Sequence, residues 1–235
     1  MANLVYYPYQ LENGNYIDKI SGKTIIKSGT IDLYPVDITP YKTPKNYLGG
    51  GGMYKTSNTQ GSFIYTNWNI FSGLTDFTIF YWAYKLGGGG CIFTSDDSGG
   101  GSGFGTSSAS FYYNHGDSIL GYHNSNTNNW AFYEFTFKKS GSNYFITCFY
   151  NGTKQYSGNV SSYYIIHTTT FLGTWSYGPR YYANGFNGYI YDFSMYDEIL
   201  HTANYTKLPY KEMNPGNRLD YLGMQNENNL YGMYK

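Results

Sequence analysis

The acidic residues decide first whether this chain could break a glycosidic bond. Enzymes that do so use two carboxylates, and alternate positions on one strand place them about 5 Å apart, as a retaining mechanism needs. The chain has five glutamates, and none is followed two residues later by an aspartate: Glu12, Glu134, Glu198, Glu212 and Glu227. Glu134 therefore stands alone in its segment, and we expect it to be an exposed strand residue. The sequence predicts that the chain is not an enzyme.

Other reactive groups are equally isolated along the chain. The four histidines, 115, 123, 167 and 201, have no partner at metal-ligand spacing. Cys91 and Cys148 are too few for a disulfide framework or a zinc site, and we expect two buried free thiols. The glycine run 87–90 lacks the Lys-Ser/Thr ending of a phosphate loop, and 101–105 lacks the strand–turn–helix setting of a nucleophile elbow.

Two loops carry residue types that could bind sugars. Aromatic rings cover the apolar C–H faces of a sugar, and amides and hydroxyls pair with its OH groups. One candidate loop contains Tyr122, Asn124, Asn126 and Asn128. The better candidate concentrates rings around one arginine, and its predicted glycan-binding residues are Trp175, Tyr177, Arg180, Tyr181, Tyr182 and Asn184. Packing of the same rings against a neighbouring subunit is an equally good interpretation.

The composition indicates what must position these loops. Aromatic residues make up 21% of the chain, with 30 glycines, and charged residues only 13%. Such a chain is not disordered, and tyrosine and phenylalanine favour half-buried strands. The formal net charge of zero leaves no positive field to capture nucleic acid or an anionic membrane, and no apolar run is long enough to span a bilayer.

Short strand-like windows recur along the chain and end at Gly or Asn. The strongest is 77–85, and the clearest hairpin joins 144–150 to 153–156 through Asn151-Gly152, the dipeptide of a type I′ turn. The other expected strands are 4–9, 16–20, 62–66, 91–94, 110–113, 119–123, 130–137, 163–168, 170–174 and 189–196, with 98–110 as a loop. One short helix is expected at 197–205. This pattern predicts an all-β sandwich of two antiparallel sheets over 1–206, followed by an extended C-terminal arm or a disordered tail at 207–235.

Five segments, in order, resemble the laminin G-like, or concanavalin A-like lectin/glucanase, jelly-roll family. The first has an aromatic-Pro-aromatic step at Tyr7-Pro8-Tyr9 and Asp18 ahead of Ser21-Gly22. The others are LTDFTIFYWAYK at 74–85, NNWAFYEFTF at 128–137, FITCFYNGTKQY at 145–156 and FNGYIYDFSMYDEIL at 186–200. Departures from the family pattern are Phe132 where His is common, Tyr191 for an acidic residue and Ser194 for Arg.

The resemblance implies a concanavalin A-like jelly roll with Trp82 in the inward-facing tryptophan position. It also implies one structural Ca²⁺ held by Asp18 and Asp192, but we favour the alternative in which Asp18 caps a turn and Asp192 pairs locally. The family's enzymes carry Glu-x-Asp-x-(x)-Glu, which this sequence lacks. Strand 77–85 is apolar on both faces, so it is either a central strand covered on each side or one with a tyrosine-lined outer surface.

Two functions remain open. One is a lectin-like adhesion module that binds glycans, and the other is a structural decoration or fibre protein on the surface of a virus particle. We expect glycans or neighbouring protein subunits as partners, including copies of this chain in a homo-oligomer, and neither nucleic acid nor membrane insertion. The first residues lack the basic and apolar regions of a signal peptide, and we favour the virion surface as location.

Overall fold

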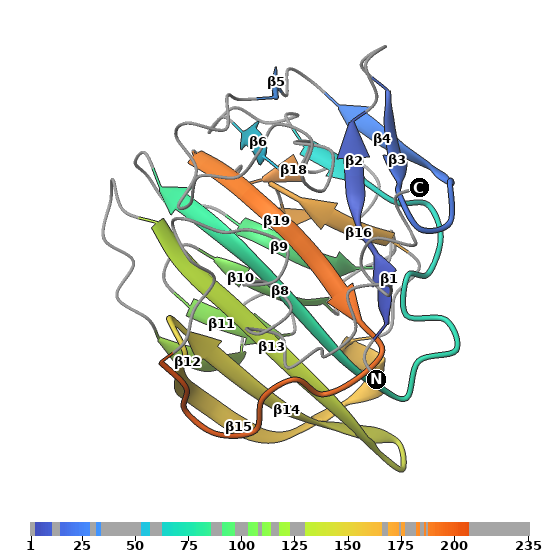
Figure 1. The fold of residues 1–235 in the computed structure, drawn as a ribbon. Coiled ribbons are helices and arrows are strands. Elements are labelled where there is room, and N and C mark those ends of the chain that lie inside the picture. Colours follow the sequence, from blue (N-terminus) through green and yellow to red (C-terminus); the bar gives the residue numbers. More distant parts are fainter. Residues whose placement is uncertain are drawn as a thin grey trace.

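The chain folds into two antiparallel sheets that pack face to face (Figure 1). The structure is a computed structural model, and it describes residues 3–10, 15–28, 32–33, 53–56, 63–85, 91–96, 103–107, 110–113, 118–122, 130–165, 169–173, 175–176, 182–183, 186 and 188–206. At some of these positions only the backbone is described. The predicted all-β, concanavalin A-like jelly-roll sandwich is confirmed. The predicted arm at 207–235 lies outside the described residues.

The first sheet has eight strands in the order β15-β14-β13-β8-β19-β6-β5, with β1 paired to β19. Its strands are β1 (Leu4–Tyr6), β5 (Asp32–Leu33), β6 (Met53–Thr56), β8 (Asp76–Lys85), β13 (Trp130–Ser140), β14 (Asn143–Tyr150), β15 (Thr153–Ser161) and β19 (Gly188–Tyr196). The β14–β15 hairpin turns at Asn151-Gly152, as predicted, and both residues have positive φ, 49° and 76°.

The second sheet has nine strands in the order β12-β11-β10-β9-β16-β7-β4-β3-β2. Its strands are β2 (Pro8–Gln10), β3 (Tyr16–Asp18), β4 (Thr24–Ser28), β7 (Phe63–Tyr65), β9 (Cys91–Asp96), β10 (Gly103–Ser107), β11 (Ser110–Tyr113), β12 (Ser118–Tyr122) and β16 (Thr169–Leu172). A separate pair joins β17 (Trp175–Ser176) to β18 (Tyr182–Ala183).

Aromatic rings fill the space between the sheets. Phe135 of β13 meets the edges of Phe104 and Phe111, from the opposite sheet, with ring centroids 5.1 and 5.0 Å apart. Tyr81 of β8 stacks on Tyr133 at 5.2 Å in the same layer. Edge-to-face and offset contacts of this kind add stability beyond the apolar area that they bury. The abundance of rings in the sequence is therefore explained by the core.

The central strand β8 is buried on both faces. Phe77, Ile79 and Tyr81 face the opposite sheet, whereas Phe80 and Trp82 lie on the outer face. There both rings pack on Phe132 of β13, with centroids 5.5 and 5.2 Å away. The first of the two alternatives for this strand is confirmed. The inward position expected for Trp82 is wrong, because strand alternation assigns the inward face to Phe77, Ile79 and Tyr81.

Three further local predictions are wrong. The strand expected at 163–168 does not begin at Tyr163, because Ser162–Tyr164 forms a turn of 3₁₀ helix, with Tyr163 N–H bonded to the hydroxyl of Ser161; residues 166–168 lie outside the described residues. The glycine- and serine-rich loop 98–110 contains strand β10. The helix expected at 197–205 is an irregular segment. Among the described residues, no helix is long and apolar enough to cross a membrane.

Candidate functional site

The segment Asp197–Thr206, called here the crossing segment, runs over the outer face of the eight-stranded sheet after β19 ends (Figure 1). Its start is fixed to the sheet and to the N-terminal region. The Asp197 carboxylate accepts hydrogen bonds from the backbone N–H and the side-chain amide of Asn3, at 2.7 and 2.9 Å. The Thr78 hydroxyl donates to the Glu198 carbonyl at 2.7 Å and accepts from the Leu200 N–H at 3.1 Å.

The other end of the crossing segment is bound to the β14–β15 hairpin. The Asn204 side-chain oxygen accepts from the Lys154 backbone N–H at 2.8 Å, and the Tyr205 N–H donates to the Gly152 carbonyl at 3.0 Å. A Cβ at Gly152 would collide with the Tyr205 carbonyl, so glycine is required there for this approach as well as for the turn. These contacts satisfy backbone groups that a helix would bond internally, which explains why the predicted helix is absent.

A buried cluster of Glu134, His201 and Tyr205 holds the middle of the crossing segment. Glu134 is fully buried, with 0% of its surface exposed, so the expectation of an exposed strand residue is wrong. Its carboxylate oxygens lie 2.9 and 3.0 Å from Nδ1 of His201, and the Tyr205 hydroxyl donates a short hydrogen bond to Oε2. The rings of His201 and Tyr205 stack at 3.8 Å, and Tyr205 also packs on Phe149 at 5.4 Å.

This cluster joins the crossing segment to the outer face of the sheet. All accepting atoms of Glu134 that the structure describes are directed at the crossing segment, which covers the carboxylate. A buried carboxylate needs partners of this kind, because an unpaired charge costs several kcal/mol. Within the described part of the chain, no three His, Cys, Asp or Glu side chains lie close enough together to hold a metal ion.

Next to this cluster, a row of hydroxyl side chains crosses the outer face of four strands. Thr78 of β8 lies opposite Thr136 of β13, which lies opposite Thr147 of β14, which lies opposite Ser157 of β15. Thr78 is used to bind the crossing segment. The other three line a groove of about 410 Å³ between the crossing segment and the hairpin.

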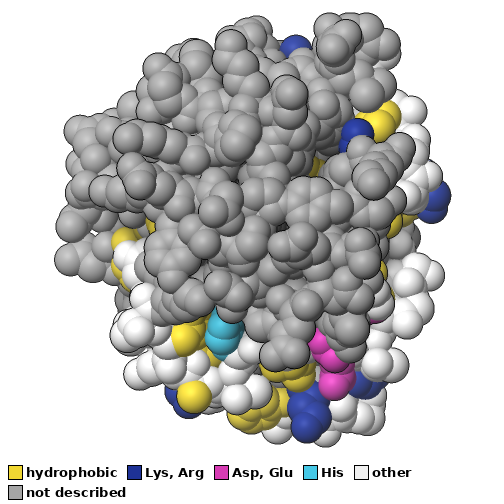
Figure 2. All heavy atoms as spheres, in the orientation of Figure 1, with side chains coloured by type: hydrophobic (Ala, Val, Ile, Leu, Met, Phe, Trp, Pro, Cys, Tyr) yellow, Lys and Arg dark blue, Asp and Glu magenta, His cyan; other side chains and the backbone are white. Residues whose placement is uncertain are grey.

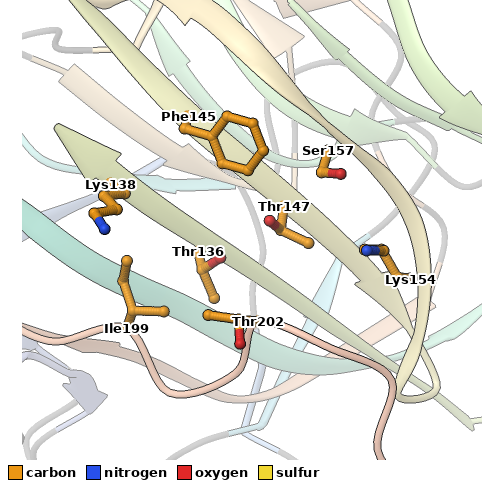
Figure 3. Close-up of a pocket in the computed structure, with 8 residues that line it drawn as sticks. All are labelled: Thr136, Lys138, Phe145, Thr147, Lys154, Ser157, Ile199 and Thr202. Carbon is orange, nitrogen blue, oxygen red and sulfur yellow. The ribbon is translucent and has the colours of Figure 1, made fainter. Parts of the chain in front are cut away.

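The groove combines a polar floor with one apolar wall on each side (Figure 3). Thr136 and Thr147 form the floor and are 3% and 5% exposed. The Phe145 ring, 42% exposed, lies on one side and Ile199 of the crossing segment on the other. The remaining lining residues are Lys138, Lys154, Ser157 and Thr202. Figure 2 shows this face as spheres, with hydrophobic, Lys or Arg, and Asp or Glu side chains next to one another toward its lower edge.

This arrangement suits a sugar in size and in chemistry. Ligand pockets commonly enclose about 300–1,000 Å³, so the groove can accept a small ligand or part of a longer one. An exposed ring can cover the C–H face of a sugar, while hydroxyl groups on the floor both donate and accept hydrogen bonds. A groove of this kind can bind a saccharide without any group that performs chemistry on it.

The predicted glycan loop is only partly described. Trp175 lies opposite Ala183, and Ser176 opposite Tyr182, in the β17–β18 pair, so the two ends of this loop run side by side. The side chains of Trp175 and Tyr182 are not described, and Tyr177, Arg180, Tyr181 and Asn184 lie outside the described residues. In the other loop, Tyr122 ends β12, and the three asparagines lie outside the described part. Both loops stay predictions.

Asp18 caps a turn. It is 2% exposed; Oδ1 accepts from the N–H groups of Tyr7 and Ile20, at 3.0 and 3.2 Å, and Oδ2 from the N–H and hydroxyl of Ser21, at 3.1 and 2.5 Å. Every one of these partners is a hydrogen donor, as in a turn cap. The Asp192 side chain is not described, so the calcium site stays a prediction.

Burial raises the pKa of the Tyr6 hydroxyl well above its ordinary value, and the nearby charge of Asp18 raises it further.

One of the two cysteines can be placed. Cys148 of β14 is a buried free thiol, as predicted, and burial raises its pKa well above the ordinary value. This shift leaves the thiol protonated and unreactive near neutral pH. The side chain of Cys91 is not described.

The sequence alone does not predict the groove. Phe145 and Thr147 alternate with buried Ile146 and Cys148 along β14, a pattern that predicts one exposed face but gives no sign of a groove. The missing information is the position of the crossing segment, which supplies the second wall. The burial of Glu134 does have a sign in the sequence. This residue lies between Phe132 and Thr136 on the outer face of its strand, and that strand pairs with the strongest apolar strand in the chain.

Comparison with known proteins supports the fold. No protein-family profile and no curated protein matches the sequence. Among solved structures, domain 4 of the GH43 arabinanase AbnA of Geobacillus stearothermophilus, in complex with arabinotriose, superposes with a TM-score of 0.52 and 15% identity, over 84% of this chain and 93% of that domain. The botulinum neurotoxin type G receptor-binding domain superposes with a TM-score of 0.50 and 15% identity, over 85% of this chain and 49% of that one.

Mouse laminin α1 domains LG4-5 also match, with a TM-score of 0.45 and 10% identity over 66% of this chain and 43% of that one. The jelly-roll fold that the resemblance implies is confirmed by the two antiparallel sheets of this chain and by its likeness to the AbnA and neurotoxin domains.

Proposed function

We propose that this chain is a non-catalytic, lectin-like protein that binds carbohydrate in the groove beside the crossing segment. The observation that carries this proposal is the groove itself, with its hydroxyl floor and the exposed Phe145 ring. The likeness in fold to a domain whose structure contains arabinotriose supports it. The loop of Trp175 to Asn184 is proposed as a second contact region for a longer glycan.

The absence of catalysis is part of the proposal. None of the eight residues that line the groove is acidic. Glu134 is the buried carboxylate nearest to it, and it is bound to His201 and Tyr205. The usual glycosidase mechanism needs a pair of carboxylates that flank the glycosidic bond, one on each side. A glycan hydrolase is therefore the weaker alternative.

We further propose that the protein acts at the surface of a virus particle, where loops and residues 207–235 contact neighbouring subunits. The zero net charge and the aromatic-rich composition support assembly into a particle. A cell-associated carbohydrate-binding module is the alternative. Immunogold labelling of particles purified from the source of the gene distinguishes the two: labelled particles support the virion, and label confined to cells contradicts it.

A glycan array probed with the purified full chain tests the binding function. We expect retention of a chemically related subset of glycans, and uniform silence across the array would contradict the proposal. Incubating the bound glycans with the protein and measuring reducing ends tests the second part. No release above buffer is expected, and steady release would show that the chain is an enzyme.

A further inference from the structure

The charged residues that line the groove are all cationic. This observation indicates which class of carbohydrate the groove would bind. Two of the eight lining residues, Lys138 and Lys154, are cationic, and none is anionic. Both lysines are exposed. Within the described part of the chain, neither ammonium group forms an ion pair with a carboxylate. The groove therefore presents two positive charges to a ligand.

Three acidic side chains near the groove have hydrogen-bond partners outside it, and a fourth, Glu198, precedes the lining residue Ile199. Asp76 lies opposite Lys138 in the strand register, but its Oδ1 accepts a hydrogen bond from the Lys139 backbone N–H at 2.9 Å. Asp197 is bound to Asn3, and Glu134 is covered by the crossing segment. Glu198 is exposed and is not among the lining residues.

The two lysines lie at opposite ends of the groove, with Thr136 and Thr147 between them (Figure 3). Lys138 is opposite Phe145, whereas Lys154 is opposite Phe149, four residues further along β14. Strand geometry separates their backbones by about 14 Å along the strands and about 10 Å across them. A ligand of more than one sugar ring suits this spacing of the two lysines.

We propose that the groove binds an acidic oligosaccharide, whose carboxylate groups pair with Lys138 and Lys154 while its ring faces pack on Phe145 and its hydroxyls on the threonine floor. The inference rests on the proposed function, because it assumes that the groove is the carbohydrate site. Charge steers such a ligand to the groove, and the ring and the hydroxyl row fix its orientation. Neutral glycans of the same backbone lose only the ionic part of the binding.

Matched glycan pairs test this proposal. Trigalacturonate is compared with its full methyl ester, and sialyllactose with lactose, within an array of such acidic and neutral pairs probed with the full chain. We expect the hits to be acidic members, with affinities that fall as NaCl is raised from low to physiological concentration and beyond. Lys138→Gln and Lys154→Gln should each weaken acidic binding by about fivefold, and the double variant by more.

Lys139→Gln is the matched control. This lysine is the neighbour of Lys138, but its ammonium lies over the Tyr144 ring, 4.6 Å from the centroid, on the other face of the strand. The control should leave acidic binding unchanged. Equal loss in all three variants would overturn the proposal, because a general change in protein charge would then explain the effect.

The outcomes separate this inference from the function on which it rests. Binding of acidic and neutral members with equal affinity, insensitive to salt, would overturn the acidic specificity and leave a lectin. Binding that is preferentially acidic but unaffected by either groove lysine would overturn the assignment to this groove. Silence of all glycans would contradict both the specificity and the proposed function.

Discussion

The two faces of strand β13 show how differently one strand can be used. Tyr133, Phe135 and Phe137 face the opposite sheet and are almost completely buried among rings. On the outer face, Phe132, Glu134 and Thr136 are also buried, but two of them are polar, and the next residue on this face, Lys138, reaches solvent. The inner face supplies the stability of the sandwich, whereas the outer face supplies the crossing-segment contacts and the groove.

The largest effect is expected on the inner face. Phe135→Ala removes a ring that contacts Phe104 and Phe111 across the sandwich, and we expect a loss of about 3–5 kcal/mol in the free energy of unfolding. Urea denaturation followed by tryptophan fluorescence measures this loss. A cost below about 1 kcal/mol would contradict the assignment of Phe135 to a close-packed core.

The outer face is tested by Glu134→Ala, which leaves His201 and Tyr205 without their acceptor. We expect a loss of about 2–3 kcal/mol in the free energy of unfolding, because hydrogen bonds to a charged group are among the stronger ones. Limited proteolysis should cut within 197–206 sooner than in the unchanged protein. Thr153→Ala, an exposed change on β15, is the control. Equal behaviour of both variants would show that the cluster does not hold the crossing segment.

Asp18 is a second buried carboxylate and can be compared with Glu134. Side chains bind Glu134, whereas mainly backbone N–H groups bind Asp18. Asp18→Asn replaces a double acceptor with a group that also donates, and we expect a loss of about 1–3 kcal/mol in unfolding free energy. With Asp18 as a turn cap, the melting temperature of the unchanged protein should be the same in EDTA and in Ca²⁺. A rise on adding Ca²⁺ that Asp18→Asn abolishes would support the calcium alternative.

The inner face should also make the protein sensitive to alkali. Burial raises the pKa of Tyr133 well above 10.0 and that of Cys148 well above 9.0, and raises the pKa of Tyr144 and Tyr150. Above the ordinary values the unfolded chain loses these protons while the folded chain keeps them, so stability falls as pH rises. Tyr133 and Cys148 each contribute up to about 1.4 kcal/mol per pH unit, and Tyr144 and Tyr150, whose pKa values are raised less, contribute less. Urea midpoints at pH 8 and pH 10.5 measure this, and equal midpoints would contradict it.

The sequence predicted what depends on local pattern. Aromatic alternation located the central strand and the long hairpin, because turn chemistry at Asn151-Gly152 and the period of two are local properties. The irregular segment 197–206 could not be predicted, because its backbone partners, Thr78 and Gly152, are distant in sequence. Glu134 and the groove depend on that segment, so the candidate site became visible only in the structure.

Binding of the strongest array glycan to Phe145→Ala tests the central claim most directly. Tyr163→Ala removes a second large exposed ring of the described residues and is the matched control, since Phe145 is 42% and Tyr163 63% exposed. If the groove is the saccharide site, isothermal titration should show affinity reduced about fivefold to tenfold in Phe145→Ala and unchanged in Tyr163→Ala. Unchanged binding in Phe145→Ala, with binding lost in Trp175→Ala, would contradict the claim and assign the site to the loop of Trp175 to Asn184.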